Sequence, residues 1–375
     1  MVQKEFIGIG SINSIKEIIE ETHAKKIFLV TGKQSYISCN AKSWIDEILN
    51  NRYVKQFNQF EVNPKLNDVY TGIGLLNNTK FDLVIAVGGG SVIDMAKLIN
   101  ILAVQKDNDL EKYINDNALI TENGLPLVAI PTTAGTGSEA THFSVVYIDN
   151  IKYSLAHYFM LPNYAIINAE LSCNLPSHIV AASGMDALSQ AVESYWSVKS
   201  TEKSKIFASE SIVLILEVLQ DAVKGDKQAR IIMSKAANLA GKAINITTTT
   251  APHAISYPIT TYFQLQHGHA VALTLGHFFE INYNFQDIDI VDPRGSNYLK
   301  NTMEQLYTMF GVKSALECKN RWHYLMDKIG LESKPKNVGI SSKYKIDKII
   351  DNVNLQRLNN NPVRVSKSTL KEIFL

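Results

Sequence analysis

The stretch FDLVIAVGGGS, residues 81–91, decides the fold class of this chain. Apart from Asp82, its first seven residues are apolar, which predicts a short strand buried on both faces of a sheet. Three glycines and a serine follow, and residues 92–103 then show the apolar periodicity of a helix. A buried strand that passes through a glycine turn into a helix is typical of a parallel sheet covered by helices.

The same alternation of strand and helix surrounds this stretch. Residues 26–30 and 127–130 are further apolar strand candidates, and residues 41–49 are a helix candidate. We therefore expect an α/β, Rossmann-like dinucleotide-binding domain with a parallel sheet over residues 1–172.

The pattern changes near residue 172. Strand signals become sparse, whereas helical periodicity recurs at 177–197, 201–222, 227–243, 302–310 and 312–329. A chain of 375 residues is also too long for one simple core. The sequence therefore predicts a second, all-helical domain over residues 173–375, whose polar tail at 355–375 carries no functional pattern.

The composition excludes several classes of function. The net charge of +1 gives no reason to expect nucleic-acid or membrane-surface binding, and no apolar run reaches the roughly 18–20 residues of a spanning helix. Cys39, Cys173 and Cys318 are scattered without CxxC spacing, which argues against a disulfide framework or a thiolate zinc site. The cysteine pattern fits a reducing compartment, and we expect a cytoplasmic protein.

Two small-residue loops follow predicted strands and form a candidate nucleotide site. Glycines at 88–90 would let the backbone approach a phosphate at the beginning of a helix, and the loop PTTAGTGSE at 131–139 adds hydroxyl groups. Either loop alone could be a tight turn or could cap its own helix. Together they stand at the strand ends where open α/β sheets bind ligands.

A candidate metal site lies in the predicted helical domain. Asp186 and Gln190 are one helical turn apart and share a face, and His253 and His267 follow downstream. A straight helix between the two histidines would hold them roughly 21 Å apart. We therefore expect a break between them, near Pro258. An aspartate with two neutral imidazoles is a reasonable open site for zinc or ferrous iron.

A nucleotide site and a metal site on one chain indicate a hydride carrier beside a Lewis acid, as in alcohol–aldehyde interconversion. At these residues the chain resembles the iron-dependent (group III) alcohol dehydrogenase family. The resemblance runs nearly end to end and is carried by Asn63-Pro64, Gly88 to Lys97, Pro131 to Glu139, Lys152, Gly184 to Tyr195 and His253 to Gly268. It implies the dehydroquinate-synthase-like fold of that family, with the site in a cleft between an α/β domain and a helical metal domain.

The resemblance also implies which residues bind the cofactor. Gly89, Gly90 and Ser91 match the turn that holds the pyrophosphate. Further matching positions around the nucleotide are Asn63, Asp94, Thr132, Thr133, Thr136, Thr141, Val145 and Lys152.

The residue after the first predicted strand bears on the choice between NAD(H) and NADP(H). Members that prefer NAD often carry an aspartate at the position of Gly32. Glycine removes a charge that would repel a 2′-phosphate, and Lys33 could contact one. We therefore expect NADP(H) to be favoured over NAD(H).

The family metal is held by one aspartate and three histidines. Asp186, His253 and His267 match three of these ligands, and Gln190 stands where the other histidine is expected. An amide oxygen is a poorer iron ligand than imidazole, so the metal ion is expected to be Fe²⁺ or Zn²⁺. The resemblance places Tyr257 near the substrate, and Tyr257 and His269 are candidate proton donors in catalysis.

Within the family, segments 137–143, 186–190 and 241–246 are similar to phosphonoacetaldehyde reductases, which form 2-hydroxyethylphosphonate. A dianionic substrate needs cations near the metal, and those of suitable type are His142, Lys152, Lys242 and His269.

Three other functions stay open. They are a general short-chain alcohol or lactaldehyde dehydrogenase, a silent nucleotide-binding protein that lost its metal at Gln190, and a dehydroquinate-synthase-like cyclase. The cyclase is disfavoured because neither a strongly basic pocket nor a third acidic ligand is evident. The resemblance further implies a homodimer or larger homo-oligomer with a small-molecule substrate.

Overall fold

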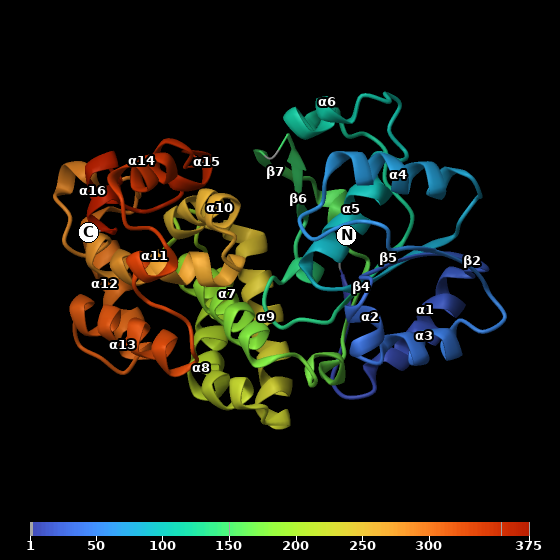
Figure 1. Ribbon diagram of the computed structural model, residues 1–375, viewed down its shortest axis with the longest axis horizontal. Coiled ribbons are helices and arrows are strands. Elements are labelled where there is room, and N and C mark those ends of the chain that lie inside the picture. The colour runs from blue at the N-terminus through green and yellow to red at the C-terminus, as the bar shows by residue number, and fades with distance from the viewer. Residues whose placement is uncertain (1–2, 150, 354, 375) are drawn as a thin grey trace. The chain divides into compact units, whose positions relative to one another are not determined.

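The computed structural model describes residues 3–149, 151–353 and 355–374. The chain divides into two compact units, residues 1–175 and 176–375, which are treated separately below (Figure 1). Among the described residues, no helix combines the length and the apolar character that crossing a membrane requires.

The N-terminal unit is built on a parallel sheet, as predicted. Its described strands pair in the order β1-β8-β5-β4-β2-β3, and every ladder between neighbours is parallel. The bounds of these strands are β1 (Lys4–Ile7), β2 (Lys26–Thr31), β3 (Tyr53–Phe57), β4 (Leu83–Gly88), β5 (Leu127–Pro131) and β8 (Tyr164–Ile167). Because all six strands run the same way, their carboxyl ends meet at one edge of the sheet.

Both faces of this sheet are buried. Alternate strand residues such as Val84 and Ala86 belong to one apolar cluster, whereas Leu83 and Ile85 belong to the other. Helices α4 (Leu66–Asn77) and α5 (Gly90–Leu102) complete the first cluster, and α1 (Ser14–Thr22) and α3 (Ala41–Ile48) complete the second. The near-continuous apolar strands of the sequence are therefore explained by helices on both sides. The remaining helices of this unit are α2 (Ser35–Ser38) and α6 (Leu110–Asn115).

An antiparallel hairpin lies outside the main sheet and was not predicted from the sequence. Strands β6 (Phe143–Ile148) and β7 (Ile151–Ala156) pair with each other over their full length. The backbone N–H of Tyr147 donates to the Pro64 carbonyl at 2.7 Å, which joins the hairpin to the segment that follows β3.

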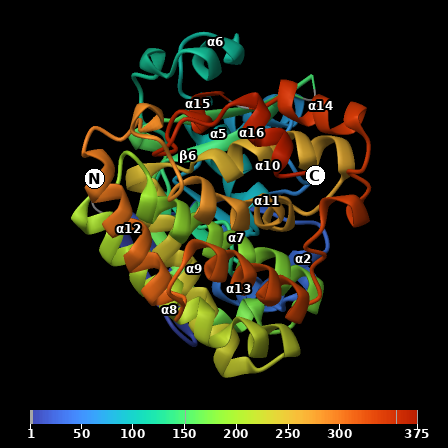
Figure 2. The same ribbon diagram turned by 90° about the vertical axis from the view of Figure 1, so that its left-hand side faces the viewer.

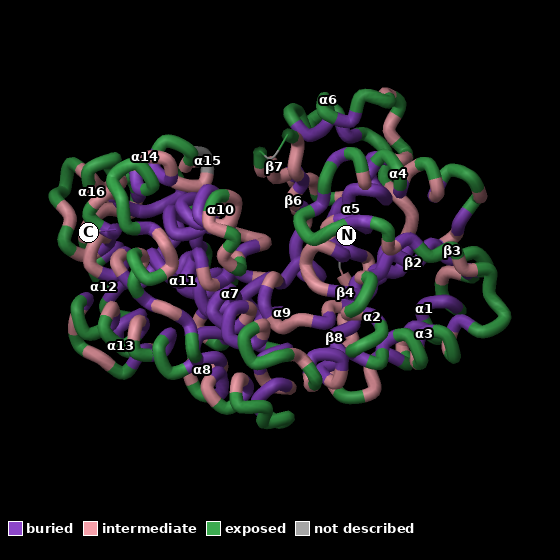
Figure 3. Tube along the Cα trace, viewed as in Figure 1, coloured by how far each residue is buried: buried purple, intermediate pink, exposed green. Residues whose placement is uncertain are grey.

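The C-terminal unit is helical, as predicted, and its described residues add one isolated β-bridge between Ile290 and Val363. The helices are α7 (Ser177–Trp196), α8 (Glu202–Lys224), α9 (Lys227–Thr247), α10 (Ala251–Phe263), α11 (His267–Ile281), α12 (Gly295–Met309), α13 (Ala315–Lys328), α14 (Lys343–Asp351), α15 (Leu355–Leu358) and α16 (Lys367–Glu372). Helices α8, α9 and α11 pack around α7, most of which is buried (Figures 2 and 3).

One predicted helix break is misplaced. Helix α10 continues through the buried Pro258, although proline lacks the N–H for the bond one turn back. The break falls instead at residues 264–266, where Gln264 adopts a left-handed conformation with φ of 56°. A left-handed residue ends a helix whether or not a proline precedes it, and it was not evident because glutamine rarely takes this conformation.

Candidate active site

Helix α7 supplies the first part of a polar cluster in an apolar setting. Asp186 and Gln190 are each 3% exposed and lie one helical turn apart. An ionised carboxylate at such a position needs partners, because burial without them is costly. The rest of the cluster provides these partners.

The turn between α10 and α11 brings the two histidines together. His253 lies in the first turn of α10, and His267 is the first residue of α11. Their ring centroids are 5.3 Å apart. Asp186, His253 and His267 each offer one ligand atom, and these three atoms lie within 4.8 Å of one another. Three candidate ligands from separate parts of the sequence thus lie close together.

Hydrogen bonds orient both imidazole rings. His253 Nδ1 is hydrogen-bonded to Glu193 Oε1, while its Nε2 lies 3.4 Å from Asp186 Oδ1. Ser256 Oγ donates to the His253 carbonyl at 2.8 Å, so its lone pair faces the Nδ1 atom of His267 at 3.5 Å. With Nδ1 held in this way, each ring in its neutral form would present the lone pair of its Nε2 atom to a metal ion.

Glu193 is a site residue that the sequence analysis missed. It is fully buried, and its Oε2 accepts hydrogen bonds from Thr250 N at 2.6 Å and Thr250 Oγ1 at 2.9 Å. Thr250 is the N-cap of α10, so Glu193 joins α7 to the start of the helix that carries His253. The signal in the sequence was spacing: Glu193 is seven positions after Asp186, on the same helical face.

The carboxylates and imidazoles of this cluster shift one another's pKa values towards the charged forms. Burial opposes a proton on His253, but the carboxylates of Glu193 and Asp186 outweigh burial and raise the pKa of His253 to about 9. Burial would likewise raise the pKa of Asp186, and the imidazoles of His253 and His267 overcome it and lower that pKa. The site therefore attracts a positive charge to the space between these side chains.

The residues present fit a divalent metal ion. Asp186 Oδ1 is buried without a well-formed hydrogen bond from a described residue, and its nearest charged partner is His253 Nε2 at 3.4 Å, which suits an oxygen that binds a cation. One carboxylate and two imidazoles are ordinary ligands of zinc and ferrous iron and leave coordination positions open. The Gln190 side chain is hydrogen-bonded to the Asp186 carboxylate, so it also helps to orient this ligand.

The N-terminal unit gathers most of the predicted nucleotide-binding residues at one edge of its sheet. The glycine turn after β4 packs against the loop after β5, so that a Cβ atom at Gly90 would lie 2.9 Å from Thr136 Oγ1. A Cβ at Gly89 would lie 3.4 Å from Thr133 Oγ1, and Thr132 N donates to the Gly88 carbonyl at 3.0 Å. No described side chain caps the N-terminus of α5. Its first N–H groups are therefore available to an anion.

Neighbouring loops complete this edge. Asn63 N donates to Ser91 Oγ at 3.1 Å, and Gly32 directly follows β2, next to the exposed Lys33. These segments come from the carboxyl ends of β2, β3 and β4. That is the edge at which parallel sheets bind nucleotides.

Four other predicted cofactor residues, Asp94, Thr141, Val145 and Lys152, take part in internal contacts. Asp94 accepts hydrogen bonds from Ser138 Oγ at 2.5 Å and Val145 N at 2.9 Å. Lys97 Nζ donates to the Thr141 carbonyl at 2.7 Å, and burial lowers the pKa of Lys97 to about 8. These bonds fasten the loop after β5 and the β6–β7 hairpin to α5. Burial raises the pKa of Asp94, and the charge of Lys152 on β7 opposes this rise.

Comparison with known proteins agrees with this geometry. Residues 3–169 match the model of the family described as iron-containing alcohol dehydrogenase, and residues 180–375 match that of the C-terminal part of the Fe-containing alcohol dehydrogenase family. The chain belongs to the iron-containing alcohol dehydrogenase family. The resemblance found in the sequence is thereby confirmed. The chain is an oxidoreductase of a family that interconverts alcohols and aldehydes with NAD(P) and a metal ion.

Individual relatives differ in the substrate that they act on. The chain is 34% identical over 274 residues to long-chain-alcohol dehydrogenase 1 of Geobacillus thermodenitrificans, covering 72% of this chain and 69% of that protein. It is 34% identical over 246 residues to phosphonoacetaldehyde reductase of Streptomyces viridochromogenes, covering 63% and 62%. The crystal structure of sulfoacetaldehyde reductase from Bifidobacterium kashiwanohense with NAD⁺ superposes with a TM-score of 0.87 at 28% identity, covering 99% and 96%.

The two predicted proton donors lie in different surroundings. Tyr257 is one turn after His253, and its ring centroid is 6.2 Å from that of His267. His269 is two positions after His267 on α11, and its Nε2 bonds to the Glu332 carbonyl at 2.7 Å. The structure therefore brings Tyr257 to the cluster, whereas His269 has its partner in the segment after α13.

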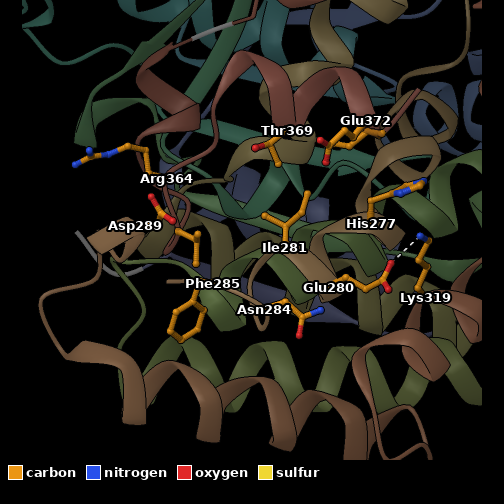
Figure 4. A pocket seen from close by; sticks show the side chains of 12 residues that line it. His277, Glu280, Ile281, Asn284, Phe285, Asp289, Lys319, Arg364, Thr369 and Glu372 are labelled. Atoms are coloured by element: carbon orange, nitrogen blue, oxygen red, sulfur yellow. Dashed lines mark hydrogen bonds and ion pairs between the residues drawn. The ribbon is translucent and has the colours of Figure 1, made fainter. Parts of the chain in front are cut away.

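A pocket of about 400 Å³ lies on the C-terminal unit, apart from the metal-ligand cluster formed by Asp186, His253 and His267. It lies between α11 and the chain around α16, and the ion pair of Glu280 and Lys319 spans 2.6 Å within it (Figure 4). Neither Asp186, His253 nor His267 lines it. The residues that line it are therefore distinct from the candidate metal ligands.

Gly268 allows α11 to pack closely against α7, because it has no Cβ atom. A Cβ at Gly268 would lie 2.0 Å from the Ala182 carbonyl oxygen and 2.7 Å from Asp186 Cβ. Gly268→Ala must therefore move α11 away from α7, and we expect a destabilisation of about 1–3 kcal/mol. Because His267 and Asp186 would separate, metal affinity measured by calorimetry should fall at least about tenfold.

Gly184→Ala on α7 is the matched control. Its Cβ would meet Leu219 Cδ1 at 2.3 Å and Met233 Cε at 3.2 Å, both ends of flexible side chains. These atoms can move by rotation, so we expect metal affinity to stay within about twofold. Equal losses in the two variants would show that the α7–α11 contact does not set the metal geometry.

Proposed function

We propose that this chain reduces phosphonoacetaldehyde to 2-hydroxyethylphosphonate with NADPH and one divalent metal ion, Fe²⁺ or Zn²⁺. The aldehyde carbon receives hydride from the nicotinamide, its oxygen receives a proton, and NADP⁺ is released. The observation that carries the proposal is the convergence of Asp186, His253 and His267 within 4.8 Å. The choice of an anionic two-carbon aldehyde is supported by the relatives named for phosphonoacetaldehyde and sulfoacetaldehyde.

Each residue of the cluster has a role in this proposal. Asp186, His253 and His267 would hold the metal ion, with Gln190 beside Asp186. When bound, the ion supplies a Lewis acid that stabilises negative charge on the oxygen of the substrate. Burial raises the pKa of Tyr257, so its hydroxyl keeps its proton at neutral pH and can donate it to the product oxygen.

The proposed preference for NADPH rests on the end of β2. A Cβ at Gly32 would lie 2.2 Å from Ser35 Oγ, so an aspartate at this position would require Ser35 to move. The exposed Lys33 offers a cation for a 2′-phosphate. The sulfoacetaldehyde reductase structure contains NAD⁺, so the two cofactors must be compared directly. A kcat/KM with NADH equal to or above that with NADPH would refute the preference.

The proposed metal role of the cluster predicts the effect of restoring a histidine at position 190. Gln190→His is expected to keep or tighten binding of Fe²⁺ and Zn²⁺, because imidazole is a better ligand than an amide oxygen. The measurement is the Kd of each ion, with Gln190→Ala as the control that supplies no ligand. Loss of metal in Gln190→His would mean that the bond from Gln190 to Asp186 matters more than an added ligand.

Turnover of a small panel of aldehydes tests the proposed substrate. The protein is loaded anaerobically with Fe²⁺ or Zn²⁺, and NADPH oxidation is followed with phosphonoacetaldehyde, acetaldehyde and lactaldehyde. A strong preference for phosphonoacetaldehyde supports the proposal. A preference for uncharged aldehydes would leave a general alcohol dehydrogenase, in line with the Geobacillus relative. No turnover in a protein that binds the cofactor would favour a silent nucleotide-binding protein.

A further inference from the structure

A cation from the C-terminal tail lies beside the metal-ligand cluster. Arg357, on the short helix α15, is hydrogen-bonded to the side chain of Tyr257 on α10, and its charge acts to lower the pKa of Tyr257 against the effect of burial. The Tyr257 ring is in turn 6.2 Å from the ring of His267. Arg357 and His253 are more than a hundred positions apart in the sequence, yet Tyr257 contacts Arg357 on one side and adjoins His267 on the other.

Other cations of this unit are engaged elsewhere. Lys242 Nζ lies 5.8 Å from the centre of the Phe207 ring, on helices α9 and α8. His269 bonds to the Glu332 carbonyl. Arg294 pairs with Asp292 at 2.6 Å. The cations chosen by residue type from the sequence in this unit, Lys242 and His269, therefore have partners outside the cluster, whereas the partner of Arg357 adjoins it.

We propose that Arg357 pairs with the anionic group of the aldehyde substrate and so sets the preference for a phosphonate or sulfonate. This inference rests on the proposed function. In phosphonoacetaldehyde only three bonds separate the carbonyl oxygen from phosphorus. The cation that pairs with the phosphonate must therefore come from a residue next to the metal ligands, and Arg357 meets this requirement through Tyr257.

The chemistry of arginine suits this role. Its guanidinium is planar and always charged, and it binds tetrahedral oxyanions through two parallel hydrogen bonds. Arg357 is half-buried, so its charge is less screened than that of an exposed lysine. The bond to Tyr257 restrains the side chain before substrate binds, which reduces the entropy lost on binding.

The test compares charged and uncharged substrates in the metal-loaded enzyme. Arg357→Gln is expected to lower kcat/KM for phosphonoacetaldehyde about tenfold to a hundredfold, the usual effect of losing a hydrogen bond to a charged group. Acetaldehyde has no anion, so its kcat/KM reports only the lost contact with Tyr257, and the ratio of kcat/KM for phosphonoacetaldehyde to that for acetaldehyde should fall. Arg357→Lys keeps the charge but lacks the planar guanidinium. Its kcat/KM for phosphonoacetaldehyde should lie between the values of wild type and Arg357→Gln. Sulfoacetaldehyde in a parallel assay distinguishes a sulfonate from a phosphonate preference.

Lys348→Gln is the matched control. Lys348 Nζ lies 3.9 Å from the centre of the Tyr262 ring, so it is also a cation held against an aromatic residue of α10. Tyr262 lies five positions beyond Tyr257, away from His253. Removing this charge should leave the ratio of the two kcat/KM values unchanged. If Lys348→Gln lowered this ratio as much as Arg357→Gln, the general surface charge and not Arg357 would set the preference for the anionic substrate.

A binding measurement separates failure of the inference from failure of the proposed function. Methylphosphonate should bind the metal-loaded wild type and bind Arg357→Gln at least about tenfold more weakly. If wild type prefers phosphonoacetaldehyde and Arg357→Gln keeps that preference, the inference is overturned while the proposed function stands. If wild type shows no such preference, the function fails, and the loss or retention of methylphosphonate binding still decides whether Arg357 is an anion site. Thermal unfolding verifies that each variant is folded. If Arg357→Gln is not folded, Arg357→Lys takes its place in the comparison with wild type.

Discussion

Replacement of His267 by alanine is expected to remove bound metal and to lower kcat/KM by about a thousandfold or more, while the protein stays folded. Only Asp186 and His253 of the convergent triad would remain, and two protein ligands hold a catalytic metal poorly. Without its Lewis acid the reaction loses several kcal/mol of transition-state stabilisation. The fold should survive because His267 is half-buried at the first position of α11 and is not part of the apolar core.

Three measurements decide this case: metal content after dialysis, the circular dichroism spectrum, and kcat/KM with added metal. His178→Ala is the control, since His178 is exposed in the first turn of α7, far along the helix from Asp186. It removes an imidazole from the same unit without changing the cluster. Full activity in a metal-free His267→Ala protein would refute the metal role of this residue.

The fold was predictable where the pattern was local. The apolar run at 81–87 and the glycines after it indicated a parallel sheet, because burial on both faces leaves no polar alternation in a strand. The hairpin β6–β7 was missed because most of its residues are half-buried and lack the continuous apolar run of the central strands of the main sheet. The course of α10 through Pro258 was missed because packing of buried neighbours outweighs one lost hydrogen bond.

The residues of the site were likewise predictable from the sequence only in part. Asp186, His253 and His267 carried a signal because their residue types suit a metal. Glu193 bonds to His253 and Arg357 bonds to Tyr257, and residue type alone predicts neither contact. Arg357 meets Tyr257 only because the tail folds back over α10, and no local sequence pattern encodes such a contact. Residues that orient or complement a site are therefore found from the structure.

The second large effect is expected for Glu193→Gln, which preserves size and removes a charge. Glu193 Oε1 accepts the Nδ1 proton of His253, and its Oε2 accepts from Thr250 N and Oγ1. A glutamine can present an oxygen to only one of these partners. If its NH₂ group faces His253, the ring must carry its proton on Nε2, where the lone pair for the metal is required. If its NH₂ group faces Thr250, two N–H donors oppose each other at the start of α10.

Either orientation weakens the site, and we expect the Kd for Zn²⁺ or Fe²⁺ to rise about tenfold to a hundredfold, as for other partners of histidine ligands. Ser194→Ala is the control: Ser194 is buried beside Glu193 and accepts a bond from Thr247 Oγ1 at 3.0 Å, but it does not bond to an imidazole. Ser194→Ala should lower the free energy of unfolding by about 0.5–1.5 kcal/mol and leave metal affinity within about twofold.

Glu193→Ala, which offers His253 no oxygen, should bind metal as weakly as Glu193→Gln. If all three variants bound metal like the wild type, Glu193 would serve only to join α7 to α10. A loss confined to the two Glu193 variants would instead show that this carboxylate sets the tautomer through which His253 binds the metal.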